Sequence, residues 1–435
     1  MGLIPPVNPI FYVFLFLAFL LLVLTLIALV RGKRARRVKA LFFGGACCLQ
    51  IVTIAYPIYL YSNKPAPLAS SSLLIAIGQN NQIVALNARD GSVRWNQPLD
   101  NESQTSIAGS PSSLFYTASI ANDGASVVTA IAASDGQQVW KSSLPQPQMY
   151  GKIQHFMVSD GFIYFDKATG VSDEVVYALR ANDGSLAWKH AEHIPNHLGD
   201  SLQPLLITAG NGLVFVRTQG SGFSALHAND GSLAWHFSPN IPQGGSVFAY
   251  QLVLVGQNVY YLQSTSGDQD VSLLALSQGN GKPLWQKHMQ GSNAYANGLA
   301  GAGAHLYLSI NGQTILLSVL NGAQLWQSPL DSGIDIAVTE ANGIVYIPGN
   351  RALNALDERD GKVLWSLSAD PDGDFTTPVL SQNVLFASAG AIAPHGFFGT
   401  GASGQDAVVA INPSNGSVYW STTNATSLIG IFHLS

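Results

Sequence analysis

The sequence predicts an all-β, eight-bladed β-propeller preceded by two N-terminal transmembrane helices. Three observations carry this prediction: two long uncharged stretches near the N-terminus, an eleven-residue segment that recurs eight times, and a composition that is 47% hydrophobic but only 10% charged. An average soluble protein is about 25% charged. The composition of these 435 residues therefore excludes a disordered chain, a coiled coil and a highly charged nucleic-acid-binding protein.

Two uncharged stretches, residues 10–30 and 41–61, predict membrane helices. Each has 21 residues and, at about 1.5 Å per residue, reaches about 31 Å, enough for the hydrocarbon core of a bilayer. Six Lys and Arg residues and no acid lie between them in residues 31–40, and such a basic loop stays in the cytoplasm. A signal peptide would carry its basic residues before the apolar stretch. Residues 1–61 are therefore expected to form a two-span anchor in the cell membrane, with the C-terminal domain extracytoplasmic.

The rest of the chain reads as a short polar linker, residues 62–72, and a propeller domain, residues 73–435. Cys47 and Cys48 are the only cysteines and fall inside the second predicted span, where a packing role is expected and acylation is the alternative. The propeller domain therefore has no disulfide. Residues 62–435 hold 14 basic and 25 acidic residues, a net charge of −11, which argues against nucleic acids and anionic lipid headgroups as partners.

An eleven-residue segment recurs eight times and ends each time in tryptophan. Its copies, which we call the docking segments, open with Ala (Leu316 in the sixth) and carry Asp-Gly or Asn-Gly at positions six and seven. They use every tryptophan of the protein and end at Trp95, Trp140, Trp188, Trp235, Trp285, Trp326, Trp365 and Trp420. Repetition at a spacing of 39 to 55 residues is typical of propeller blades.

Each docking segment predicts an antiparallel hairpin. Asp-Gly or Asn-Gly between alternating apolar runs favours a two-residue type I′ turn, in which both central residues have positive φ. A further apolar strand lies upstream of each hairpin, as at residues 73–77 and 384–387, and a fourth small-residue strand usually precedes it. Four strands in each repeat make one blade of a propeller.

The recurrent tryptophans and the C-terminus predict how the blades join. We expect each indole to bury against the neighbouring blade with its N–H bonded to a backbone acceptor, and the small first residue of the segment to allow that close approach. The first repeat has only three good strands, while an apolar run, residues 428–434, follows the last tryptophan. The C-terminus is therefore expected to supply the missing inner strand and close the ring.

The docking segments resemble the tryptophan-docking motif of the pyrrolo-quinoline quinone (PQQ) repeat, and eight copies are the number found in quinoprotein-type propellers. The resemblance covers about residues 68–435. It implies two kinds of relative: PQQ-dependent dehydrogenases of alcohols or sugars, and a non-enzymatic propeller that serves as a scaffold in bacterial outer-membrane protein assembly.

The dehydrogenases of this family hold the quinone with a tryptophan floor, a disulfide between adjacent cysteines and a calcium ion. This chain has no tryptophan outside the docking segments, and its adjacent cysteines fall in a predicted span. We therefore expect a membrane-anchored, non-enzymatic scaffold that binds protein partners at the cell surface without a cofactor. A membrane-bound dehydrogenase that uses PQQ with calcium is the alternative.

Two groups of side chains are candidate metal ligands. Three imidazoles and a carboxylate that follow the third docking segment could bind zinc or copper: His190, His193, His197 and Asp200. Three alternating carboxylates resemble an oxygen-rich calcium loop, although the downstream Glu of such loops is absent: Asp370, Asp372 and Asp374. The ordinary alternatives are a solvated loop for the first group and an Asp-rich turn for the second.

A Gly-rich segment, residues 390–404, is the candidate binding loop. It joins the second and third predicted strands of the last blade and carries Phe397 and Phe398, which could contact a peptide or glycan. Arg351 and His395 could add polar contacts. The alternative is that the segment folds over the channel mouth as a plug.

Overall fold

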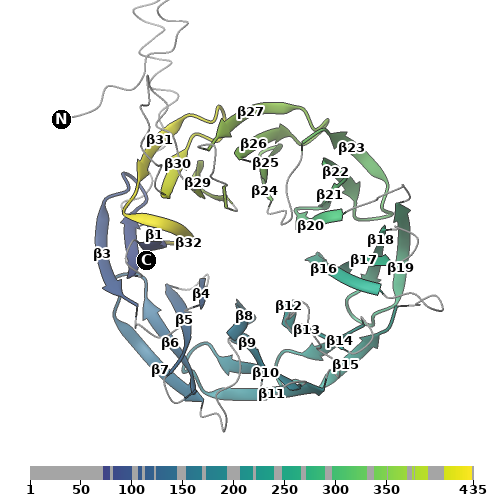
Figure 1. The fold of residues 1–435 in the computed structure, drawn as a ribbon, viewed down its shortest axis with the longest axis horizontal. Helices are drawn as coiled ribbons and strands as arrows, with labels where there is room; N and C mark the ends of the chain where they lie inside the picture. The colour runs from purple at the N-terminus through teal and green to yellow at the C-terminus, as the bar shows by residue number, and fades with distance from the viewer. Residues whose placement is uncertain are drawn as a thin grey trace, which may run out of the picture. The chain divides into compact units, whose positions relative to one another are not determined.

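The propeller domain consists of eight four-stranded antiparallel sheets arranged in a ring (Figure 1). The computed structural model describes residues 72–78, 82–99, 106–109, 113–121, 124–144, 153–168, 173–193, 206–218, 222–239, 247–265, 271–289, 296–330, 338–349, 351–369, 375–376, 378–389 and 406–433. This confirms the predicted all-β, eight-bladed fold. Within the described residues, no helix has the length and apolar character that crossing a bilayer requires. The two predicted spans, with Cys47 and Cys48, lie outside them.

The blades are numbered in chain order, and the strands of each blade run from the inner to the outer edge. The first four blades are β32 (Ala425–His433), β1 (Ser72–Gly78), β2 (Gln82–Asn87) and β3 (Val93–Pro98); β4 (Ser106–Gly109), β5 (Leu114–Ile120), β6 (Ser126–Ala132) and β7 (Gln138–Leu144); β8 (Ile153–Ser159), β9 (Phe162–Ala168), β10 (Asp173–Arg180) and β11 (Leu186–His193); β12 (Leu206–Gly210), β13 (Leu213–Arg217), β14 (Phe223–His227) and β15 (Leu233–Phe237).

Blades 5 to 8 have the same order. They are β16 (Val247–Val255), β17 (Asn258–Thr265), β18 (Val271–Ser277) and β19 (Pro283–Met289); β20 (Ala296–Ala302), β21 (His305–Ile310), β22 (Gln313–Ser318) and β23 (Gln324–Ser328); β24 (Thr339–Ala341), β25 (Ile344–Gly349), β26 (Ala352–Asp357) and β27 (Val363–Ser368); β28 (Val379–Ser381), β29 (Val384–Ala389), β30 (Ala407–Ile411) and β31 (Val418–Thr422).

The hydrophobic core is divided into eight layers, one between each pair of neighbouring blades. Between blades 5 and 6, for example, Tyr260 and Leu273 pack in one cluster with Leu306 and Leu308. Because the middle strands face a neighbour on both sides, they are near-continuous apolar runs, as in the fully buried β29. Outer strands such as β7 alternate between exposed and half-buried residues.

The C-terminal strand closes the ring, as predicted. β32 pairs antiparallel with β1 along its whole length, from Ser72 opposite His433 to Gly78 opposite Ala425. Blade 1 is therefore built from both ends of the propeller domain, and β32 lies toward the centre of the ring in Figure 1. This pairing covers the edge of β1 that would otherwise be open.

The turn of the docking segments differs from the prediction. In the first segment Gly91 has a φ of +71°, whereas Asp90 is absent from the residues with positive φ, and the same holds for the other seven copies. A type I′ turn needs both, so that prediction is wrong. Residues 88–92 form a longer turn in which the Gly91 N–H donates to the Asn87 carbonyl over 2.8 Å.

A bulge before the tryptophan explains the longer turn. Ala85 pairs with Trp95 while Leu86 pairs with Val93, so one extra residue is inserted into the outer strand. The register shifts at the same place in all eight blades. Such a bulge re-aims the following side chain, and here that side chain is the indole. Two-residue turns with positive φ at both residues do occur between other strands, at Asp160–Gly161 and Asn211–Gly212 among others.

Candidate functional site

The eight indoles link the blades in a closed cycle, as predicted. Each indole N–H donates to the carbonyl of the residue at position four of the next docking segment. The donor–acceptor pairs are Trp95–Ala133 at 3.0 Å, Trp140–Ala181 at 3.3 Å, Trp188–Ala228 at 2.8 Å, Trp235–Gln278 at 2.7 Å, Trp285–Val319 at 3.0 Å, Trp326–Glu358 at 2.7 Å, Trp365–Pro413 at 2.9 Å and Trp420–Ala88 at 3.2 Å. The last bond joins blade 8 to blade 1.

Each indole also covers the turn glycine of the next blade. A Cβ atom added to Gly231 would lie 2.7 Å from the ring of Trp188, and the other seven turn glycines meet the preceding indole at 2.5 to 2.9 Å. Glycine is therefore required at this position for two reasons: the backbone has a positive φ, and the indole ring leaves no room for a side chain.

A pair of glycine substitutions within blade 4 separates these two requirements. Gly231→Ala is expected to reduce the free energy of unfolding by about 1–3 kcal/mol more than Gly212→Ala, because overpacking adds to the backbone strain. Gly212 is the matched control: its φ is +78°, close to the +71° of Gly231, but nothing lies within 4 Å of its added Cβ. Urea unfolding of both variants measures the difference, and equal losses would show that the indole does not press on the turn.

The docking contacts use all eight tryptophans, and each lies on an outer strand. The chain therefore has no tryptophan left to form the floor of a quinone site. In this respect its residues do not fit the PQQ site implied by the repeat resemblance.

The candidate histidine group is described only in part. His190 and His193 lie on β11, and the His190 Nε2 atom is 2.9 Å from the Glu192 Oε1 atom. His197 and Asp200 lie outside the described residues, so zinc or copper binding by this group stays a prediction.

Most of the other candidate site residues lie outside the described residues, so their roles stay predictions. This applies to Asp370, Asp372, Asp374, His395, Phe397 and Phe398. Arg351 is described: it is exposed, has a φ of +61° and lies in the turn between β25 and β26. Residues 390–404 join β29 to β30, again the second and third strands of a blade. Such turns lie at one end of every blade, so Arg351 and the ends of β29 and β30 that this segment connects share a face of the ring.

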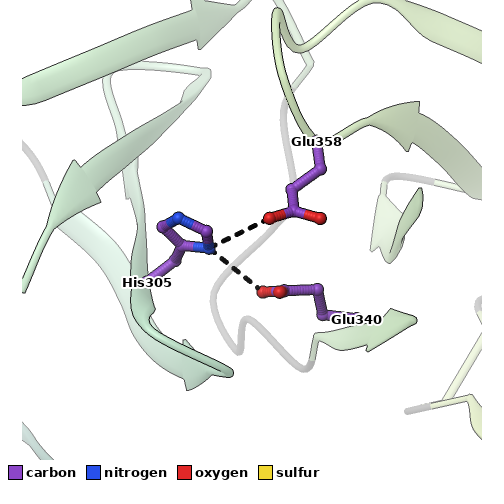
Figure 2. Close-up of side chains that lie close together, drawn as sticks. All are labelled: His305, Glu340 and Glu358. Atoms are coloured by element: carbon purple, nitrogen blue, oxygen red, sulfur yellow. Dashed lines mark hydrogen bonds and ion pairs between the residues drawn. The ribbon is translucent and has the colours of Figure 1, made fainter. Parts of the chain in front are cut away.

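A cluster that no sequence motif predicts lies between blades 6 and 7 (Figure 2). His305 begins β21, Glu340 lies on β24 and Glu358 lies in the docking turn of blade 7. The His305 Nδ1 atom is 3.4 Å from Glu340 Oε2 and 3.5 Å from Glu358 Oε1. The side chains of His305, Glu340 and Glu358 are 22%, 15% and 24% exposed, so water reaches the cluster.

Two neighbours hold Glu340 in place. The hydroxyl of the buried Tyr307 donates to Glu340 Oε2 over 3.0 Å. Burial, together with the charges of Glu340 and Glu358, raises the pKa of Tyr307, so it stays a protonated donor. Gly303, with a φ of +54°, lies against the carboxylate: an added Cβ would be 2.6 Å from Glu340 Oε1.

No local motif joins His305, Glu340 and Glu358, which come from two blades. All three lie beside turns that join the first and second or the third and fourth strands of a blade, at the face opposite Arg351. One signal in the sequence was available: position four of the docking segments holds an acid only at Glu358, against Ala in four of the other copies.

A group of charged residues in blades 3 and 4, most of them buried, lies at the other face of the ring, where the second and third strands of a blade are joined. Lys167 on β9 donates from Nζ to the carbonyl of Gly124 in blade 2, over 2.8 Å. Burial lowers the pKa of Lys167, and burial raises the pKa of Glu174 on β10 while the charge of Arg217 on β13 opposes that rise. The Lys167 hydrogen bond connects blades 2 and 3, and we assign this group a structural role.

The repeats of this chain match the model of one known protein family. Residues 60–161, 172–296 and 269–429 match the family model described as outer membrane protein assembly factor BamB. The outer membrane protein assembly factor BamB of Yersinia pestis is 25% identical over 285 residues, which are 62% of this chain and 68% of that protein.

Solved structures show the same fold. The crystal structure of BamB from Moraxella catarrhalis superposes with a TM-score of 0.50 at 14% identity, covering 74% of this chain and 92% of that one. Dihydro-heme d1 dehydrogenase NirN in complex with DHE has a TM-score of 0.56 at 11% identity, covering 85% and 76%. At these identities the likeness concerns the fold alone, which an assembly factor and a dehydrogenase share.

Proposed function

Because the chain belongs to the family whose model is described as outer membrane protein assembly factor BamB, we propose that it is a scaffold that binds protein partners. The proposal includes the predicted membrane anchor at residues 1–61 and an extracytoplasmic position of the propeller. The closed cycle of docking contacts supports it, since a rigid ring can hold a binding surface in one shape without ordering it on association.

One observation carries the proposal: exposed apolar side chains recur at one place in the blades. All ten large apolar residues that are exposed in the described part of the chain lie in docking segments, nine of them in the two positions before the tryptophan. We call these ten the aliphatic rim: Val93, Val139, Leu186, Leu233, Leu284, Leu320, Leu325, Val363, Leu364 and Val418.

The aliphatic rim lies beside an open strand edge. Nine of its residues are on outer strands, and each outer strand has a partner on only one side within its sheet. An open edge with apolar side chains is suited to pair with an extended segment of another protein. Leu233 is 61% exposed and Leu320 is 84% exposed, so these side chains are available for an apolar contact with a partner.

Crosslinking in native membranes tests this role. Leu233→Glu combined with Val363→Glu is expected to remove at least one partner that is crosslinked to the wild-type chain, because a charge cannot be buried in an apolar contact. Lys189→Glu is the control: it also adds an acid to an exposed position of an outer strand, outside the rim, and it should keep every crosslink. An identical partner set for the rim variant and the wild type would contradict rim-based binding.

The orientation of the anchor has a separate test. With residues 31–40 held in the cytoplasm, a peptide tag placed after Ser435 should be digested by protease added outside the cytoplasmic membrane. A tag that is cut only after this membrane is lysed would reverse the proposed topology.

A further inference from the structure

We propose that His305, Glu340 and Glu358 bind one divalent transition-metal ion of the zinc class, which joins blade 6 to blade 7. The three side chains come from the two sides of this blade interface (Figure 2). This assignment goes beyond partner binding and does not depend on it.

The spacing of the ligand atoms fits a bound ion better than a direct ion pair. A charged N–H···O hydrogen bond is typically about 2.7–2.9 Å long, but His305 Nδ1 is 3.4 Å and 3.5 Å from its two carboxylate oxygens. One N–H that is shared between two acceptors at these distances makes only a weak bond to each. Ligands about 2.1 Å from a tetrahedral ion lie about 3.4 Å from each other, and these two distances agree with that value. All three ligand atoms lie within 4.8 Å of one another.

The charge of the cluster also favours a cation. Two carboxylates face a single imidazole, which is neutral when it ligates a metal. Among the described residues, the salt bridges of Glu340 and Glu358 involve His305 alone. A divalent ion would neutralise the two negative charges and relieve their mutual repulsion.

Neighbouring residues orient the proposed metal ligands. Tyr307 donates to Glu340 Oε2, and such hydrogen bonds orient carboxylate ligands. The partial exposure of the three side chains leaves room for water to complete the coordination. One imidazole with two carboxylates is a ligand set of zinc and its neighbours, whereas calcium takes oxygen ligands only.

Zinc binding to the purified full chain in detergent, measured by equilibrium dialysis with elemental analysis, tests the site. The wild type should bind one Zn²⁺ per chain more than either His305→Gln or Glu358→Gln. Tyr307→Phe should keep the ion with about 10-fold weaker affinity, as expected for a supporting hydrogen bond. Zinc should also raise the melting temperature of the wild type, because binding to the folded state alone stabilises it, and this rise should be absent in the two ligand variants.

Two controls separate this site from other histidines and from misfolding. The control variants are Glu192→Gln, which changes another His–Glu pair, and a triple change of His190, His193 and His197 to Gln. Both should keep the ion that His305→Gln loses. The melting temperature without zinc shows whether each variant is folded. Equal zinc binding by the wild type and both ligand variants would overturn the proposal, as would the absence of zinc binding by the wild type.

Discussion

Deletion of residues 426–435 is expected to abolish the single cooperative unfolding transition of the propeller domain. These residues hold nearly all of β32, the inner strand of blade 1. Their loss exposes the edge of β1 and removes Phe432, which is 3% exposed and packs with Phe115 at a ring distance of 6.1 Å between blades 1 and 2. It also removes the hydrogen bond from the Leu428 N–H to the Ser388 hydroxyl in blade 8.

Thermal unfolding followed by circular dichroism and calorimetry measures this effect. The truncated chain should show a broad transition at lower temperature, or should aggregate through the open edge of β1. Deletion of residues 434–435, which follow β32, is the control and should leave the transition unchanged. A sharp transition of the truncated chain at the wild-type temperature would mean that β32 is not part of the ring.

Trp188→Ala is expected to lower the free energy of unfolding by about 3–5 kcal/mol, the usual cost of removing a buried aromatic side chain. Trp188 is 7% exposed, lies 5.9 Å from the ring of Tyr164 and donates to the carbonyl of Ala228 in the next blade. Its loss leaves a cavity above Gly231 and an acceptor without its partner.

Trp188→Phe separates packing from hydrogen bonding in the same site. It keeps an aromatic ring but removes the N–H, so its cost should exceed the roughly 1 kcal/mol of one hydrogen bond yet stay below that of the alanine variant. Urea unfolding gives both values. A cost below about 1 kcal/mol for Trp188→Ala would show that the docking tryptophan does not hold neighbouring blades together.

The sequence was sufficient to predict the ring because its determinants are local and repeated. Eight tryptophans at one position implied eight equivalent contacts, and the structure confirms each indole bond, including the closing one from Trp420 to Ala88. The missing inner strand of blade 1 could be inferred because the apolar run after Trp420 had no other place in the pattern. In contrast, the turn type was mispredicted: Asp-Gly at Asp90–Gly91 also occurs in the longer turn that a bulge before the tryptophan requires.

The candidate metal cluster could not be predicted because it depends on how two blades meet. His305, Glu340 and Glu358 are separated by 35 and 18 residues, and only the packing of blade 6 on blade 7 brings them together. The exposed aliphatic rim was missed for a related reason. From the sequence, an apolar residue before the tryptophan is predicted to lie in the core. Its exposure follows only from its place at the start of an outer strand, as with Leu233.

A designed disulfide across the closing strand pair tests the central claim, that the C-terminal strand completes the first blade. In a chain with Cys47→Ser and Cys48→Ser, the pair Ile77→Cys and Ser427→Cys places two cysteines at register partners of β1 and β32. Such positions lie about 4.5–5.5 Å apart between their Cα atoms, within disulfide range. The pair Ile77→Cys and Ile431→Cys is the control, since Ile431 lies opposite Leu74, three residues away along β1. Rapid, near-complete oxidation of the first pair alone is the predicted result; no oxidation of the first pair, or equal oxidation of both, would contradict the closed ring.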